Sequence, residues 1–273
     1  MMRDAKLQTA GNNTMVIVVV WIAFAFTLSS CGESESVSGI RMESSIKTIS
    51  AHALVFQRMK GGLAELETPP LSTNHGGSIL VLSVGRGEIS AFEPPTDNLN
   101  NTAYPQIGSA HAYTRWPKSG TALYALANGH GGEGQVISVS TPPADEITMA
   151  AVEVLGSHIE DVAWNEDREP PIFWSLRRKL FSGRSMTSHK VKTSGPATLI
   201  AFWWGDASSA KAKTAEPDQG FLVIDSLLEE GSLVQCAVAV KHVEKAGTYD
   251  VNWTATPIQG AQMWLVAVAD NEH

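Results

Sequence analysis

Short runs in which apolar and polar residues alternate restrict the fold of this chain more than any other feature. In residues 248–256 every second side chain is apolar or aromatic: Tyr249, Val251, Trp253 and Ala255. Runs 78–84 and 198–204 are apolar almost throughout. Clusters of Gly, Pro, Asn and Asp separate the runs, and no long amphipathic helical pattern occurs. We therefore expect an all-β fold of antiparallel strands, because parallel strands need crossover helices.

The strand pattern occurs twice along the chain. A shift of 114 residues superimposes positions 122–154 on a later segment, with Ile137 on Val251 and Val152 on Val266. Upstream, a shift of 120 superimposes residues 79–85 on 199–205. Turn residues and strand faces match better than identities do, which indicates an internal duplication.

Two repeats of this length predict two tandem antiparallel β-sandwiches, immunoglobulin-like or jelly-roll in type. The first sandwich is expected over residues 46–156 and the second over 186–273. Residues 157–185 mix charge, a Pro pair and aromatic residues, so we expect an ordered connector. Its Trp164 is expected to pack on the sandwiches.

Composition excludes some classes of protein. Hydrophobic residues make up 43% of 273, which is enough for a core and argues against disorder. Lys and Arg number 20 against 28 Asp and Glu, a net charge of −8. Nucleic acid is therefore not expected as a partner, because phosphate binding needs clustered cations. No cofactor is expected, since residues 129–134 lack the Lys and the following helix of a phosphate-binding loop.

The N-terminus has the pattern of an export signal. Arg3 and Lys6 precede an uncharged apolar run, 15–28, which is shorter than the ~20 residues of a transmembrane helix. The run ends in Leu28-Ser29-Ser30-Cys31, which resembles the lipobox of bacterial lipoproteins. An ordinary signal peptide, or an anchor helix with an incidental Cys, stays open as an alternative.

The lipobox resemblance implies a lipid-anchored protein of the bacterial cell envelope. In that family the signal peptide, here 1–30, is cleaved before the Cys, and the thiol, here of Cys31, takes a diacylglycerol that partners the membrane. Polar residues 31–45 would form a flexible tether. Gly32 is compatible with the outer membrane. With Cys31 lipidated, Cys236 has no disulfide partner and is expected to be a buried, inert residue.

The body also resembles a poorly characterised group of bacterial secreted and phage-associated tandem β-sandwich proteins. The resemblance rests on the 97–102 turn (DNLNNT), the 122–125 run, the 146–154 strand, and the segments 197–207 and 247–256. It implies an extracellular β module without an agreed activity. Asn100 stands where that group has Gly, so Asn is expected to adopt the left-handed conformation there.

Two groups of residues are weak candidates for binding. Four oxygen-bearing side chains could hold calcium, although Asx-turns explain them equally: Asp97, Asn98, Asn100 and Asn101. Four tryptophans on predicted strands could stack on sugar rings if exposed, although a core role is the alternative: Trp203, Trp204, Trp253 and Trp264. Trp203 and Trp204 must face opposite ways, so one of that pair is the candidate for exposure.

No residue pattern identifies an enzyme. The eight histidines lack metal-ligand spacing, and no GxSxG nucleophile elbow is present. A glycosidase would need two close carboxylates, for which the candidates are Glu88, Glu93, Asp145, Glu146 and Glu153. We therefore expect a non-catalytic binding, adhesion or structural lipoprotein with a polysaccharide or protein ligand. A glycan-acting hydrolase and a phage-tail-like structural module are the alternatives.

Overall fold

The computed structural model describes the body of the chain in nine stretches: residues 47–57, 64–87, 92–101, 104–140, 146–168, 184–206, 214–228, 234–256 and 260–271. The expected signal peptide, Cys31 and the whole tether, residues 31–45, lie outside these residues. Within the described stretches no helix is long and apolar enough to cross a membrane.

The described residues form antiparallel strands in two successive sets. The first set is β1 (Ile49–Gln57), β2 (Glu65–Glu67), β3 (Leu71–Ser72), β4 (Ser78–Arg86), β5 (Thr96–Asp97), β6 (His111–Ala112), β7 (Gly120–Ala127), β8 (Glu133–Gln135), β9 (Ile137–Ser140) and β10 (Ile147–Leu155). The second set is β11 (His158–Asp167), β12 (Arg184–Thr187), β13 (Val191–Thr193), β14 (Ala197–Asp206), β15 (Glu216–Pro217), β16 (Leu222–Leu227), β17 (Val234–Val243), β18 (Gly247–Tyr249), β19 (Asn252–Thr256) and β20 (Gly260–Ala269).

The two sets have the same topology. The first builds a five-stranded sheet, β1-β10-β4-β7-β6, and the second builds β11-β20-β14-β17-β16. Smaller sheets, β2-β9-β5 and β3-β8, accompany the first, and β12-β19-β15 and β13-β18 accompany the second. Each strand of the first repeat thus has a counterpart ten labels later. The expected all-β fold with two tandem sandwich units is confirmed, including the internal repeat.

Strand pairing corrects the alignment of the repeats. Val154 and Val268 are 114 residues apart, as expected, but they pair with Ile79 and Thr198, which are 119 apart rather than 120. Ile79 and Thr198 also pair with Ala127 on β7 and His242 on β17, which are 115 residues apart rather than the expected 114. A one-residue error exchanges the two faces of a strand. The sequence did not reveal this one-residue error, because both faces of these strands are buried and their residues are apolar almost throughout.

Residues expected to form a connector begin instead with an edge strand. β11 pairs with β20 along almost its whole length, and both β11 and β1 carry a bulge at the matched position, before Asp161 and Ala51. The second sheet therefore starts at His158 rather than at residue 186. Trp164 on β11 packs against the central core, as expected. Charged residues in β11 hid the strand, because an edge strand is only half-buried.

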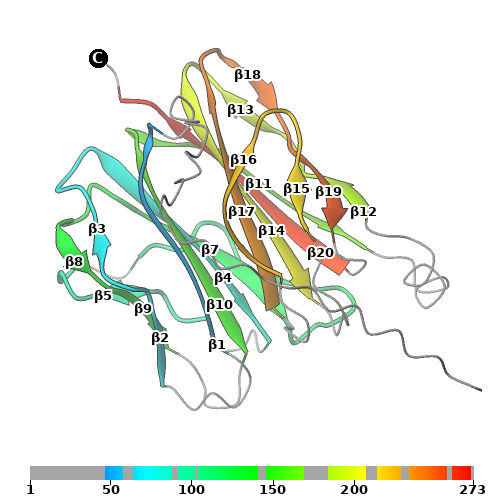
Figure 1. Cartoon of the computed structure of the whole chain (residues 1–273), viewed down its shortest axis with the longest axis horizontal. Helices are drawn as coiled ribbons and strands as arrows, with labels where there is room; N and C mark the ends of the chain where they lie inside the picture. The colour runs from blue at the N-terminus through cyan, green and yellow to red at the C-terminus, as the bar shows by residue number, and fades with distance from the viewer. Residues whose placement is uncertain are drawn as a thin grey trace, which may run out of the picture. The chain divides into compact units, whose positions relative to one another are not determined.

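The sheets of the body are stacked in layers (Figure 1). Three apolar cores lie between these layers. Each five-stranded sheet packs one face on the small sheets of its own repeat, with Leu82 and Ile137 in the first such core and Leu199 and Val251 in the second. The remaining faces of the five-stranded sheets form a central core that includes Val152 and Val266. Both repeats contribute to this core, and the described residues belong to one compact unit.

Candidate functional site

The four candidate tryptophans are all core residues. Trp203 and Trp253 lie in the core of the second sandwich, and Trp204 and Trp264 lie in the central core. None is more than 2% exposed. The expectation of an exposed member is therefore wrong, and these rings present no surface to a sugar. Trp203 and Trp204 do point to opposite faces of β14. Both faces are covered, so the two side chains lie in different cores and neither reaches the surface.

The Asp97 turn is closed by its own hydrogen bonds. The Asp97 carboxylate accepts from the amides of Leu99 and Asn101, and from the side chains of Asn101, Tyr104 and Gln135 at 2.7–2.8 Å. Burial alone would raise the pKa of Asp97, but these donors outweigh it and lower the pKa. Donors surround the carboxylate where a cation would need further oxygen ligands.

The other members of the calcium candidate serve the same turn. Asn98 Oδ1 accepts from the amide of Val136, and Asn101 Nδ2 donates to the His130 carbonyl. Asn100 has a φ of 61°, which confirms the expected left-handed position. In the described stretches, no three His, Cys, Asp or Glu side chains gather as metal ligands. The Asx-turn interpretation therefore fits this loop.

Of the carboxylates suggested for catalysis, Glu146 and Glu153 have structural partners, and Glu93 is exposed. Glu153 is buried and accepts hydrogen bonds from Ser50, Asn74 and Ser78. Glu146 accepts from the amide of Val234. Glu88 and Asp145 lie outside the described residues. Cys236 is fully buried, and burial raises the pKa of its thiol, as expected for an inert residue.

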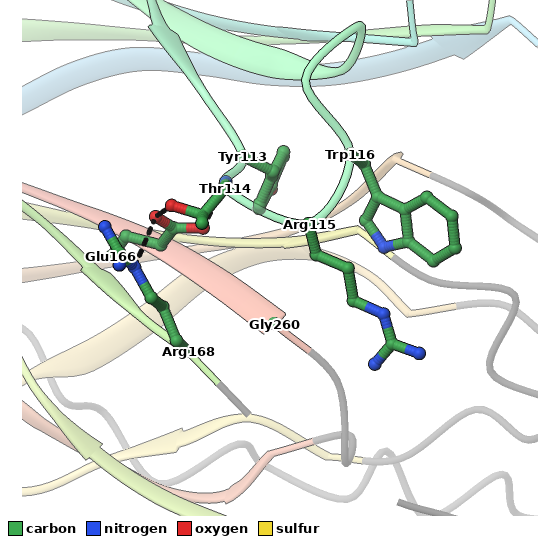
Figure 2. Close-up of a pocket in the computed structure, with 7 residues that line it drawn as sticks. All are labelled: Tyr113, Thr114, Arg115, Trp116, Glu166, Arg168 and Gly260. Atoms are coloured by element: carbon green, nitrogen blue, oxygen red, sulfur yellow. Dashed lines mark hydrogen bonds and ion pairs between the residues drawn. The ribbon is translucent and has the colours of Figure 1, made fainter. Parts of the chain in front are cut away.

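A surface pocket combines residues of both repeats (Figure 2). Its volume is about 250 Å³, and it is lined by Tyr113, Thr114, Arg115, Trp116, Glu166, Arg168 and Gly260. The first four follow β6 in the first repeat. Glu166 lies on β11, Arg168 follows that strand, and Gly260 begins β20 in the second repeat. The pocket therefore depends on the packing of the repeats on each other.

Turn geometry places Trp116 at the surface. The Ser119 amide donates to the Trp116 carbonyl at 2.8 Å, and the Tyr113 amide donates to the Ser119 carbonyl at 2.9 Å. Pro117 follows Trp116, which suits the second position of such a turn. Trp116 is 43% exposed, one of two large hydrophobic residues exposed to that degree among the described ones. The Arg115 guanidinium carbon lies 5.3 Å from the Trp116 ring centroid, within cation–π range.

Glu166 joins the two sides of the pocket. Its carboxylate accepts from the Thr114 amide at 2.7 Å, from the Thr114 hydroxyl at 2.5 Å and from Arg168 Nε at 3.3 Å (Figure 2). The Glu166 side chain is only 6% exposed. Its oxygens therefore hold the loop of the first repeat on β11, and they are already engaged by donors.

A stack of rings supports the β6 strand that leads into the pocket loop. His111 lies parallel to Trp164, with ring centroids 3.8 Å apart, and Gln262 Nε2 donates to the His111 carbonyl at 3.0 Å. Burial lowers the pKa of His111, so the imidazole is neutral at pH 7. The strand that leads into the pocket loop is thereby held by uncharged contacts.

Sequence reasoning missed Trp116, Arg115 and Arg168 as a site. One signal was available, since Trp116 lies in a Pro- and Gly-containing turn rather than on an alternating strand. Nothing in the sequence connects that turn to residues about fifty positions later. No protein-family model matches this chain, and no curated protein or solved structure matches it either.

Proposed function

We propose that this chain is a lipid-anchored binding protein of the bacterial cell envelope that acts without catalysis. Its paired β-sandwiches share a central core, and the pocket beside Trp116 holds a ligand. Carbohydrate is the ligand class that this pocket suits best. Anchoring rests on the lipobox that ends at Cys31, with residues 31–45 as the tether.

One observation carries the ligand-binding part of the proposal. Trp116 exposes much of its indole at the pocket, whereas the four tryptophans on β14, β19 and β20 are buried. An exposed aromatic ring offers an apolar surface for the C–H face of a sugar, and neighbouring polar groups can bind the hydroxyls. The pocket residues come from a tightly hydrogen-bonded loop and a strand end, so little ordering is needed on binding.

The arrangement of the carboxylates supports a role without catalysis. Hydrolysis of a glycosidic bond needs two carboxyl groups about 5–10 Å apart that are free to exchange protons. Glu166 is the carboxylate that lines the pocket, and its oxygens are bonded to Thr114 and Arg168. Glu153 is enclosed by its own donors.

Binding of glycans tests the function. The full chain, purified in detergent, should bind members of an array of bacterial and host glycans, and Trp116→Ala should lose that binding while keeping its circular dichroism spectrum. Val223→Ala is the matched control, because Val223 is the other large hydrophobic residue that is exposed within the described stretches. Absence of binding to every glycan, or equal binding by Trp116→Ala, would contradict the proposal. Release of reducing ends from a bound glycan would instead favour a hydrolase.

Lipidation tests the anchor separately. Wild-type protein expressed in bacteria should incorporate radiolabelled palmitate and remain with the membrane fraction. Cys31→Ser should do neither, because the thiol that takes the lipid is missing. Incorporation of palmitate into Cys31→Ser would show that the anchor lies elsewhere.

A further inference from the structure

We infer that the Trp116 pocket faces away from the membrane that anchors the chain, so that its carbohydrate belongs to a polymer or surface opposite that membrane and not to a glycolipid of the same bilayer. This inference rests on the proposed function and specifies its partner. It is carried by the strand register, by the contacts of Thr48 and by the length of the proposed tether.

The chain enters the body at one end of both five-stranded sheets. Thr48 precedes β1, and its carbonyl accepts from the amide of Leu155, the last residue of β10, at 2.7 Å. The Thr48 hydroxyl accepts from the hydroxyl of Thr198, near the start of β14 in the second repeat, at 2.8 Å. Both repeats therefore hold the point at which the chain joins the body.

In the first repeat the pocket lies at the other end of the sheet. β4 begins at Ser78, which pairs with Leu155 beside the entry of the chain. It ends at Arg86, which pairs with Gly120. The loop that carries Trp116 leads directly into Gly120 at the start of β7. The whole length of β4 thus separates Trp116 from the entry.

The second repeat gives the same direction. β20 ends at Ala269, which pairs with Ala197, the neighbour of Thr198. The strand begins at Gly260, which lines the pocket. β20 has 10 residues, which at about 3.3 Å each place the pocket about 30 Å from the entry of the chain.

The proposed tether is shorter than this distance. Residues 31–45 are rich in Ser, Glu and Gly, and a flexible chain of that length spans about 20 Å on average. A lipid at Cys31 therefore keeps the entry of the chain close to the bilayer, while the sheets carry the pocket beyond it. Trp116 would reach the bilayer only if the body lay on its side, and a chain of net charge −8 gains no attraction from anionic lipids in doing so.

A pocket in this place suits a glycan that approaches from outside the bilayer. Glycolipid headgroups lie at the surface of the membrane, on the side of the entry and about 30 Å from the pocket. A cell-wall polymer or an opposed surface meets the pocket end of the body first. Trp116 lies at that end, and it is the most exposed large hydrophobic residue of the described stretches.

Energy transfer to the bilayer tests the orientation. Full-length lipidated protein would be placed in phosphatidylcholine vesicles that contain a lipid-linked acceptor. A donor dye would be attached to a cysteine introduced by Lys118→Cys in the pocket loop, or by Glu244→Cys after β17, whose last residue pairs with Ala197 at the entry end. Both side chains are exposed, and Cys236 is buried, so the dye reacts at the introduced position.

We expect transfer from position 118 to be about half that from position 244 or less, because about 30 Å separates the two ends of the sheets. Equal transfer from both positions, or stronger transfer from 118, would overturn the inference and leave the anchor intact. No transfer from either position would overturn the anchor and the inference together.

Two presentations of the same glycan test the partner. Vesicles that carry the full-length protein should bind beads coated with glycans of the array, vesicles with Trp116→Ala should not, and those with Val223→Ala should bind as wild type does. The same glycan linked to phosphatidylethanolamine in the protein's own, dilute vesicles should reduce bead binding by no more than about twofold, because a tether that cannot span two sites gives a low effective concentration.

The failures of this test are distinguishable. Strong inhibition by the glycolipid, with binding that still needs Trp116, would overturn the inference and leave the proposed carbohydrate binding intact. Binding to no coated bead, by protein that remains with the vesicles, would overturn both.

Discussion

The two repeats share one topology but meet through faces of opposite shape. At three matched positions of the central core the first repeat carries small residues and the second carries large ones: Ser83 against Phe202, Gly85 against Trp204, and Ala150 against Trp264. A Cβ at Gly85 would lie 2.6 Å from the Trp204 ring, so this glycine makes room for it. The two repeats have thus diverged in a complementary way, so that large side chains of the second repeat fill the space beside small residues of the first.

The two repeats also differ in the strand that supplies a carboxylate to a matched turn. In the first repeat, Glu153 on β10 accepts from the amide of Asn74 at 2.9 Å. In the second repeat the matched amide, that of Ser194, donates to Glu160 on β11 at 3.0 Å. Glu160 occupies the bulge position that Ser50 holds in the first repeat. The turn keeps its carboxylate partner although the carboxylate comes from a different strand, so the fold conserves the interaction rather than the residue.

Removing a large side chain from the central core should disrupt the complementary packing of the two repeats. Trp204→Ala should lower the free energy of unfolding by about 3–5 kcal/mol, because it opens a cavity and leaves the Ser83 hydroxyl without the indole donor at 2.9 Å. Urea denaturation measures this change.

Trp116→Ala is the control for that substitution. It removes the same side chain from an exposed site, so we expect a loss of only about 0.5 kcal/mol. If the two variants were equally stable, the central core would not hold the repeats together.

Adding one methyl group on the small side should also cost stability. Gly85→Ala should destabilise the fold by about 1–3 kcal/mol, because the new Cβ would overlap Trp204 and Val234. Gly195→Ala is the matched control, since no heavy atom lies within 4 Å of a Cβ there. In a Trp204→Ala background the cost of Gly85→Ala should fall, because only the overlap with Val234 remains, and a double-mutant cycle that finds simple additivity would refute the shape argument.

The polar link between the repeats gives a smaller effect. Thr121 accepts from Trp264 Nε1 at 2.9 Å and donates to Gln262 Oε1 at 2.6 Å, whereas its counterpart in the second repeat is Cys236. Thr121→Val should lower the free energy of unfolding by about 1–2 kcal/mol, since both partners stay buried. Thr254→Val, which removes an exposed hydrogen bond, should cost less, and thermal melting of the two variants compares them.

The smallest effect concerns an ion pair between the edge strands of the two sheets. His52 Nδ1 lies 2.5 Å from Asp225 Oδ2, and Val162 stands at the position that matches His52. The hydrogen bond to Asp225 raises the pKa of His52, although burial opposes it. A raised folded pKa means that the stabilisation is complete below the unfolded pKa of about 6.5 and is lost as pH rises through the folded value.

We therefore compare wild type with His52→Gln at pH 5.5 and pH 8.5. Wild type should be more stable by about 0.5 kcal/mol at pH 5.5, a small value because both side chains are partly exposed, and the difference should shrink at pH 8.5. A difference that grew with pH would mean that the imidazole is held neutral.

The sequence by itself determined the all-β class, most strand positions and the repeat, because alternation and turn residues are local signals. The apolar runs 78–84 and 198–204 appear as the strands Ser78–Arg86 and Ala197–Asp206. Tertiary structure alone decided which strand face meets which layer. A strand buried on both sides shows apolar residues everywhere, so nothing local distinguishes the central core from the outer ones. The pocket was also decided by tertiary structure alone, because packing of the two repeats brings the Trp116 turn against Glu166, Arg168 and Gly260.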